Sequence, residues 1–209
     1  MIKNKLSISK GNSKLQGINN FSLPPVKSCP NCSFCFQTLT NSQGKKIKLE
    51  CYAMKAYKSK VRQNVRKAWD KNFNIAQENL EKFYDDMVEF LKHTRKTIFR
   101  IHVSGDFFSQ AYLEKWFEII RLFPNIRFLT FTKAFSLDFS NKPINLIVYA
   151  SIMPNMAIPL DFINRFNTLQ AFCDIPENYN PTIATKCPGS CAKCQFCWSS
   201  QKNVFFAVH

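Results

Sequence analysis

The sequence predicts an α/β fold in which a mostly parallel sheet forms an open, partial (βα) barrel with two cysteine-rich metal loops. After Arg95 the chain alternates between strand-like and helix-like segments, which is typical of parallel strands joined by right-handed crossovers. The first clear strand, Ile98–Val103, places Arg100, His102 and Ser104 on one face. A fully packed barrel interior would exclude these polar groups, whereas an open barrel with a polar cavity accommodates them.

Apolar runs and turn residues define the elements after Arg95. The predicted strands are Ile98–Val103, Ile126–Thr132, Asn145–Ile152, Thr168–Cys173 and Asn203–Val208. Ser109 can cap a helix that has an apolar stripe, and Pro124 ends this helix. A second, short helix is expected over residues 159–166. In folds of this kind, ligands sit beyond the carboxyl ends of the strands. Asp106, Lys133 and Ser151 fall there.

The first 95 residues have a different character. Lys55–His93 predicts one long helix or two broken ones, and Phe21–Val26 predicts a strand that Pro24 and Pro25 confine to a sheet edge. We therefore expect a single domain over residues 1–209. It consists of a basic region with the first cysteine loop and helices (1–95) and of βα units with the second cysteine loop (96–209).

Length and composition exclude several classes of protein. The chain has 209 residues, 45% of them hydrophobic, and has no apolar run near the roughly 20 residues that span a bilayer. The residues that follow Met1 lack the apolar block of a secretory signal. We expect a cytoplasmic protein that does not contact a membrane. A phosphate-binding loop and the nucleophile motif of hydrolases are both absent from the sequence.

The net charge of +15 is concentrated at one end of the chain. Residues 1–71 hold fifteen lysines and arginines against two acids, a net charge of +13. Such a field attracts phosphates, so nucleic acid or a nucleotide is the predicted partner, although solvated surface lysines would give the same count. The candidate contact residues are Lys45, Lys46, Lys48, Lys55, Lys58, Arg62 and Arg66.

Eight of the nine cysteines form two groups. The first contains Cys29, Cys32 and Cys35, with Cys51 fifteen residues further on; the second contains Cys187, Cys191, Cys194 and Cys197. In a cytoplasmic protein such groups are metal ligands more often than disulfides. Cys173 stands apart and is interpreted as a small buried residue on a strand.

The spacing of the second group favours a 4Fe–4S cluster over zinc. Zinc sites usually take two ligands from each of two separated Cys-x-x-Cys knuckles, whereas a run of cysteines about three residues apart wraps an iron–sulfur cluster. The first group has the same rhythm, but its insert over residues 36–50 would also suit a zinc loop. Cys51 either completes that first site or belongs elsewhere.

Four separated motifs resemble the gene product 88 family of phage and mobile-element proteins. They are Leu23–Pro30, Cys51–Tyr57, Arg100–Ser109 and the ending from Cys187 to His209. The resemblance covers most of the chain and would place a phage-encoded protein in the host cytoplasm. This family's layout is in turn similar to the partial barrel of radical S-adenosylmethionine enzymes.

The second resemblance implies a possible enzyme. Ser104, Gly105 and Asp106 would hold the ammonium group of S-adenosylmethionine, and His102 and Asp106 would be the candidate catalytic residues. Those enzymes typically use Cys-x3-Cys-x2-Cys early in the chain, whereas this sequence has the x2-x2 spacing at Cys29. A turn in which Asp106 caps the next helix is the structural alternative.

Three functions therefore compete at this level. The first is an iron–sulfur protein, with two 4Fe–4S clusters, that acts on or binds nucleic acid or a nucleotide. The second is a radical S-adenosylmethionine-like enzyme, and the third a nucleic-acid-binding protein stapled by zinc. A redox-active cluster would also require an electron donor, while a simple electron carrier would not need so large a body.

Overall fold

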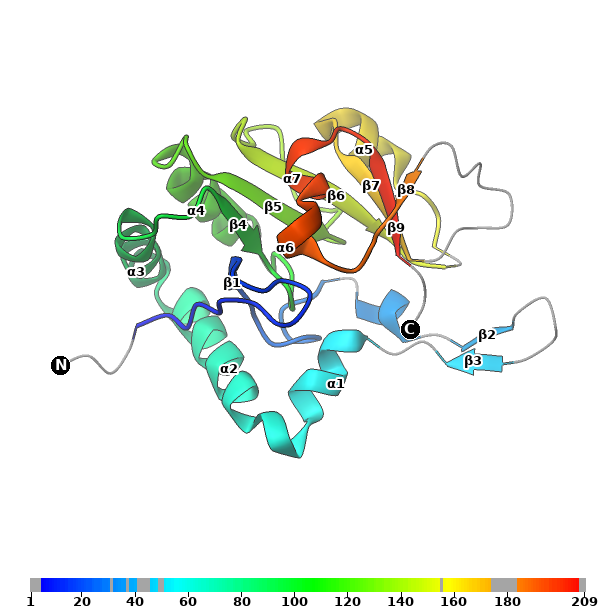
Figure 1. Cartoon of the computed structure of the whole chain (residues 1–209), viewed down its shortest axis with the longest axis horizontal. Helices are drawn as coiled ribbons and strands as arrows, with labels where there is room; N and C mark the ends of the chain where they lie inside the picture. The colour runs from blue at the N-terminus through cyan, green and yellow to red at the C-terminus, as the bar shows by residue number, and fades with distance from the viewer. Residues whose placement is uncertain are drawn as a thin grey trace.

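Seven strands form one open sheet in the computed structural model, which describes residues 5–30, 32–36, 38–40, 46–48, 51–154, 156–173 and 184–206 (Figure 1). The strands are β1 (Asn19–Phe21), β4 (Ile98–Ile101), β5 (Arg127–Thr132), β6 (Leu146–Ile152), β7 (Leu169–Cys173), β8 (Ala184–Lys186) and β9 (Asn203–Phe206). Their order is β1-β4-β5-β6-β7-β9-β8, and each pairing within this sheet is parallel. The predicted α/β class and parallel sheet are confirmed. Within the described residues β1 and β8 do not pair with each other, so the sheet is not closed.

Helices cover one face of this sheet. They are α3 (Leu80–Lys92), α4 (Gln110–Arg121) and α5 (Leu160–Phe166). The core on this side joins Phe99 and Phe128 of the sheet to Phe83 of α3 and Trp116 of α4. Alternate residues of each strand reach this layer, as the period of two requires.

The opposite face is covered by the N-terminal segment and two short helices, α6 (Cys191–Cys194) and α7 (Phe196–Ser199). Trp198 of α7 is buried here, where its Nε1 donates a hydrogen bond to the Phe99 carbonyl at 3.4 Å. Arg127 donates to the Trp198 carbonyl at 3.1 Å. These two bonds fix α7 over β4 and β5.

Local signals account for α4 and α5. Ser109 caps α4 by accepting a hydrogen bond from the Tyr112 amide at 3.3 Å, as its position before the apolar stripe predicts. Asn167 ends α5 in the left-handed conformation, with φ of 45°.

The region predicted as one or two helices contains three. They are α1 (Tyr52–Lys58), α2 (Gln63–Glu78) and α3, with the 3-10 turn η2 (Lys60–Arg62) after α1. The extended residues Ser59 and Asn79 interrupt the helical backbone, and the Asn79 side chain caps α3. In Figure 1, α1 and α2 form a V that projects from the body.

Two pairings at the sheet edges matter for the cysteines. β1 is short and lies at one edge, and the chain leads from it to Cys29. The strand predicted over Phe21–Val26 is wrong beyond Phe21, because a turn begins at Pro25. At the other edge β9 inserts between β7 and β8, so the second cysteine group lies on the connection between two parallel strands.

Two further strands, β2 (Thr38–Thr40) and β3 (Lys46–Lys48), form a separate antiparallel pair. Among the helices that are described, none has both the length and the apolar character needed to cross a membrane.

The turn after β4 brings the first cysteine loop against the sheet. Strand geometry ends at Ile101, earlier than predicted, because His102 and Gly105 adopt positive φ values of 56° and 82°. A Cβ atom on Gly105 would lie 2.5 Å from Ser28 Oγ and 2.6 Å from Leu23 Cβ. The close packing of this turn on the loop therefore requires glycine.

Replacing Gly105 with alanine is expected to destabilise the fold by roughly 3 kcal/mol, from backbone strain plus overpacking. Gly17 is the matched control because its φ is also positive, at 76°, but a Cβ atom there would meet nothing within 4 Å. Gly17→Ala is expected to cost only about 1 kcal/mol. Urea denaturation of both variants measures the difference; equal losses would contradict the close packing at Gly105.

Candidate functional site

The four cysteines of the second group line one cavity of about 170 Å³. Cys187 follows β8, and its amide donates to the Phe205 carbonyl of β9 at 2.9 Å. Cys191 begins α6, and its amide donates to the Lys14 carbonyl at 2.8 Å. Between α6 and α7 the left-handed residue Gln195, with φ of 47°, reverses the chain. The loop thus wraps its cysteines around a common space.

These thiols are close enough to influence one another electrostatically. Burial raises the pKa of Cys191, and it raises the pKa of Cys197 to about 12. Cys187 and Cys194 raise both values further, whereas Arg100 lowers them. Cys191 and Cys197 are therefore protonated at neutral pH, and metal binding to them would have to release protons.

The donor set of the second group is four thiols, which both iron–sulfur clusters and zinc accept as ligands. In the part of the chain that the structure describes, no three Cys, His, Asp or Glu side chains are arranged to hold a single metal ion. The predicted metal loops are therefore not confirmed as metal sites. The chemistry of the second group nevertheless fits a cluster, because four thiols surround a cavity whose wall includes Phe196, Trp198 and Val204.

Two cysteines of the first group, Cys29 and Cys51, lie close enough to interact electrostatically. Burial raises the pKa of Cys29 to about 12, and the nearby Asp106 and Cys51 raise it as well. Lys133 acts on the same thiol in the opposite direction. This pair lies near the carboxyl ends of β4 and β5, where a ligand of a parallel sheet is expected.

The other two cysteines of that group are less fully described. Cys32 is half-buried in the 3-10 helix η1 (Cys32–Cys35), and the side chain of Cys35 lies outside the described atoms. Cys173 lies at the end of β7, on a strand as predicted, but it is only partly buried.

The Asp106 carboxylate accepts three hydrogen bonds from the protein. Its Oδ1 accepts from the Phe107 amide at 2.8 Å and from Thr132 Oγ1 at 2.7 Å, and its Oδ2 accepts from the Lys133 amide at 2.7 Å. Burial raises the pKa of Asp106, and these hydrogen bonds oppose the rise. The carboxylate therefore ties the turn after β4 to the end of β5.

Ser104 and His102, two further predicted site residues, are both buried next to Asp106 in the chain. Ser104 Oγ is buried without a hydrogen-bond partner among the described atoms. His102 packs in the helix-side core, where its ring lies 4.7 Å from the Phe107 ring and its Nε2 lies 2.9 Å from the Tyr112 hydroxyl. The prediction that His102 faces the cavity assumed strand alternation, which the positive φ of His102 interrupts.

The predicted basic surface is centred on α1, η2 and α2, here called the basic hairpin. Lys55, Lys58, Arg62 and Arg66 are all exposed on it, while Lys46 and Lys48 are exposed on β3 and Lys45 lies outside the described residues. Tyr57 and Trp69 stack with ring centroids 6.4 Å apart, which joins α1 to α2. At the tip, Val61 is 96% exposed.

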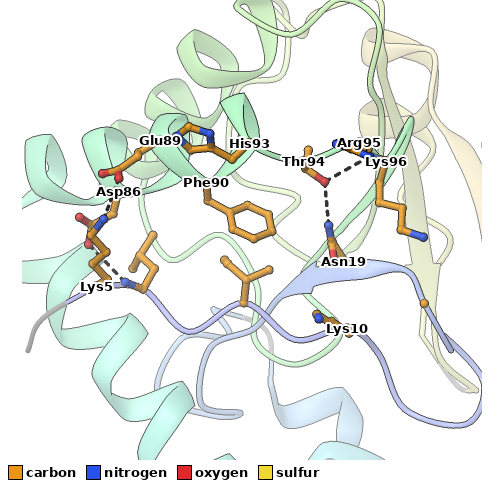
Figure 2. A pocket seen from close by; sticks show the side chains of 13 residues that line it. Lys5, Lys10, Asn19, Asp86, Glu89, Phe90, His93, Thr94, Arg95 and Lys96 are labelled. Atoms are coloured by element: carbon orange, nitrogen blue, oxygen red, sulfur yellow. Dashed lines mark hydrogen bonds and ion pairs between the residues drawn. The ribbon is translucent and has the colours of Figure 1, made fainter. Parts of the chain in front are cut away.

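A groove of about 580 Å³ lies elsewhere, between α3 and the N-terminal segment (Figure 2). Lys5 pairs with Glu89 at 2.7 Å, and Asn19 donates to Thr94 Oγ1 at 3.0 Å. Asn19 begins β1 and Thr94 precedes β4, so the groove adjoins the amino ends of these strands. It is lined by none of the residues predicted from sequence to be functional.

The fold and site define an α/β protein with an open parallel sheet and a cysteine-lined cavity on one face. By sequence the chain belongs to the gene product 88 family. The model of this family, described as "Gene product 88", matches residues 2–182 of the chain. It is 26% identical to "Gene 88 protein" of Mycobacterium phage D29 and 28% identical to "Gene 88 protein" of Mycobacterium phage L5. Each alignment covers 99% of this chain and 94% of the relative. No solved structure matches the chain. The predicted family is confirmed.

The buried His102 should make stability depend on pH. Burial, with a smaller contribution from Arg100, lowers its pKa from 6.5 to about 3. Between these values the unfolded chain binds a proton that the folded protein excludes, so stability falls as pH decreases below 6.5. His102 alone should remove about 1.4 kcal/mol between pH 7.5 and pH 5.5.

Urea denaturation at the two pH values measures this loss. His102→Asn is the comparison variant, because asparagine tolerates positive φ and does not titrate in this range. It is expected to be less stable at both pH values but to lose less stability between them. An identical pH dependence in the two proteins would rule out a neutral, buried His102.

Proposed function

We propose that this protein binds a 4Fe–4S cluster through Cys187, Cys191, Cys194 and Cys197 and contacts nucleic acid through the basic hairpin. The observation that carries the proposal is the common cavity lined by all four cysteines. Four thiol ligands within eleven residues match the requirement of a cluster for four ligands at separate corners.

The cations around the cavity support four thiolates that together with a bound metal form an anionic site. Four thiolates concentrate negative charge, and two cations of this chain act on Cys191, namely Lys14 and Arg100. Lys14 Nζ lies 4.7 Å from the centre of the Phe206 ring, close to this face of the sheet. Zinc held by four thiolates would also be anionic, so metal analysis must separate the two.

The ligands of the cluster and the residues around them would have different roles. A bound cluster supplies one-electron chemistry. The cysteines would lose their protons on binding, while Trp198 and Phe196 would limit the access of water. The hydrogen bonds of Trp198 and Arg127 would keep the loop in one position over the sheet.

The first cysteine group is proposed as a second metal site. Its support is the proximity of Cys29 and Cys51 near the carboxyl ends of β4 and β5, on the rim of what we interpret as a partial barrel. Asp106 already accepts three protein hydrogen bonds, which favours a structural or electron-transfer role over the binding of an ammonium group. A radical S-adenosylmethionine-like reaction is the alternative.

The basic hairpin supports nucleic acid as the partner. Its cations project on two helices, and the stacked Tyr57 and Trp69 hold those helices together. Phosphates are contacted by such lysines and arginines without regard to sequence, so binding would be strongly dependent on salt.

Protein purified without oxygen is expected to be brown, with broad absorption near about 400 nm and about four irons and four sulfides per cluster. Cys191→Ser combined with Cys194→Ser should remove the iron of the second group and lower the melting temperature, because ligand binding stabilises the folded state. Cys173→Ser is the matched control, and it should keep its iron. Stoichiometric zinc in colourless protein would refute the cluster.

The same preparation tests the alternative reaction. Electron paramagnetic resonance of the reduced protein is recorded with and without S-adenosylmethionine. We expect no change in the signal if Cys51 closes the first site. A changed signal followed by release of 5′-deoxyadenosine would instead establish a radical enzyme.

Neutralising the hairpin should weaken nucleic-acid binding uniformly across sequences. The variant Lys55→Gln, Arg62→Gln, Arg66→Gln removes three exposed charges and should reduce the slope of log K against log salt by about three. The control Lys92→Gln, Arg95→Gln, Lys96→Gln removes three exposed charges at the end of α3 and just after it, and the last two of these residues line the groove of Figure 2. Fluorescence anisotropy with a labelled DNA duplex and single strand measures both. An equal loss of affinity in the two variants would mean that binding depends only on the net charge of the protein, which would contradict a contact surface on the basic hairpin.

A further inference from the structure

We propose that Arg100 and Tyr149 form a floor beneath the second cysteine group that favours the reduced, more negative state of its cluster. This inference rests on the proposed iron–sulfur function. It assigns a role to two side chains on the sheet that are not metal ligands. The sequence places Arg100 on the polar face of the predicted strand Ile98–Val103 but does not indicate a role for it.

The floor is built on three adjacent strands. The Arg100 guanidinium of β4 lies 4.0 Å from the centre of the Phe131 ring of β5. Phe131 in turn stacks on Tyr149 of β6, with centroids 4.9 Å apart and an interplanar angle of 17°. Phe131 and Tyr149 are direct partners in the parallel register. The three side chains therefore form a continuous layer.

The cysteine loop lies directly on this layer. Cys191 and Cys197 pack against the same cluster of side chains as Phe131, Tyr149 and Trp198. Because Trp198 donates to the Phe99 carbonyl, the residue before Arg100, the loop is held in this position by a bond to β4 itself.

Arg100 is a partly buried cation, and no carboxylate among the described residues forms an ion pair with it. Its Nε and Nη2 each lie 3.4 Å from the His102 carbonyl, and no ion pair within the described residues contains it. Burial lowers the pKa of Arg100, while Tyr52, Cys191, Cys197 and, least of these, Asp106 raise it. Two of these four groups are thus cysteines of the second group. A buried charge is costly unless an opposite charge compensates it. Thiolates at these two cysteines would supply that compensation.

Tyr149 provides a hydrogen bond at the other end of the layer. Its hydroxyl lies 3.1 Å from the Lys202 carbonyl and within hydrogen-bonding reach of Cys197. Burial raises the pKa of Tyr149, so the phenol keeps its proton at neutral pH. The hydroxyl donates its one proton to the Lys202 carbonyl, so a thiol at Cys197 can donate to the phenol oxygen. A thiolate at Cys197 can only accept, and it would compete with the Lys202 carbonyl for that proton.

Arg100 and Tyr149 are both expected to raise the midpoint potential of the cluster. Reduction adds one negative charge to a cluster, and a nearby cation or hydroxyl donor stabilises that charge more than it stabilises the oxidised state. Removing either group should therefore shift the midpoint potential to a more negative value. The loss of a partly buried full charge should have a larger effect than the loss of a neutral hydroxyl.

The test compares four variants of the full chain, purified without oxygen. Arg100→Met removes the cation but keeps much of the side-chain length, Arg100→Lys keeps the charge, and Tyr149→Phe removes only the hydroxyl. Arg165→Met is the control for loss of one arginine, because its side chain is 66% exposed and stands in a different part of the fold. Iron and sulfide content is measured first, and the midpoint potential then follows from a redox titration monitored by electron paramagnetic resonance.

We expect a negative shift in Arg100→Met, a smaller one in Tyr149→Phe, and values near that of the unmodified protein in Arg100→Lys and Arg165→Met. An unchanged potential in Arg100→Met with full iron content would overturn the inference. If Arg100→Met does not fold, Tyr149→Phe decides, and an unchanged potential there counts against the floor. Unmodified protein without iron would instead refute the proposed function, which separates the two failures.

Discussion

The buried Asp106 carboxylate is the interaction on which the first part of the site depends. It joins the turn after β4 to Thr132 and Lys133 at the end of β5. The same turn contains Gly105, whose missing side chain admits Ser28 and Leu23 and so brings Cys29 to the sheet. A carboxylate buried this deeply is tolerated because each of its oxygens accepts hydrogen bonds from fixed donors. The arrangement positions a loop, and that explains a buried acid without assigning it to catalysis.

The sequence predicted the elements whose signals are local. The apolar stripe and the Ser109 cap define α4, and segments rich in β-branched and aromatic residues define β5 and β6. The strand β8 was missed because Ala184–Lys186 has only three residues and no apolar pattern. Its pairing with β9 is non-local, so nothing near those residues signals it.

The site was predictable in composition but only partly in geometry. Cysteine spacing identified the second group, whose four members line one cavity. Parity placed Arg100 and His102 on the same face, yet the left-handed backbone at His102 sends its ring into the aromatic core. Backbone reversal of this kind depends on what packs around the residue. Alternation along a strand cannot reveal it.

The basic hairpin and the first cysteine group share an anchor. Cys51 directly precedes α1, and the hydroxyl of Tyr52 donates to the Val103 carbonyl beyond the end of β4. The first turn of the hairpin is therefore tied to the sheet beside Cys29 and Asp106. Any ligand that repositions Cys51 must also move the start of α1, and the stacked Tyr57 and Trp69 would pass that movement to α2. The basic hairpin proposed to contact nucleic acid is thus connected through Cys51 and α1 to the first proposed metal site, although the two are made from different residues.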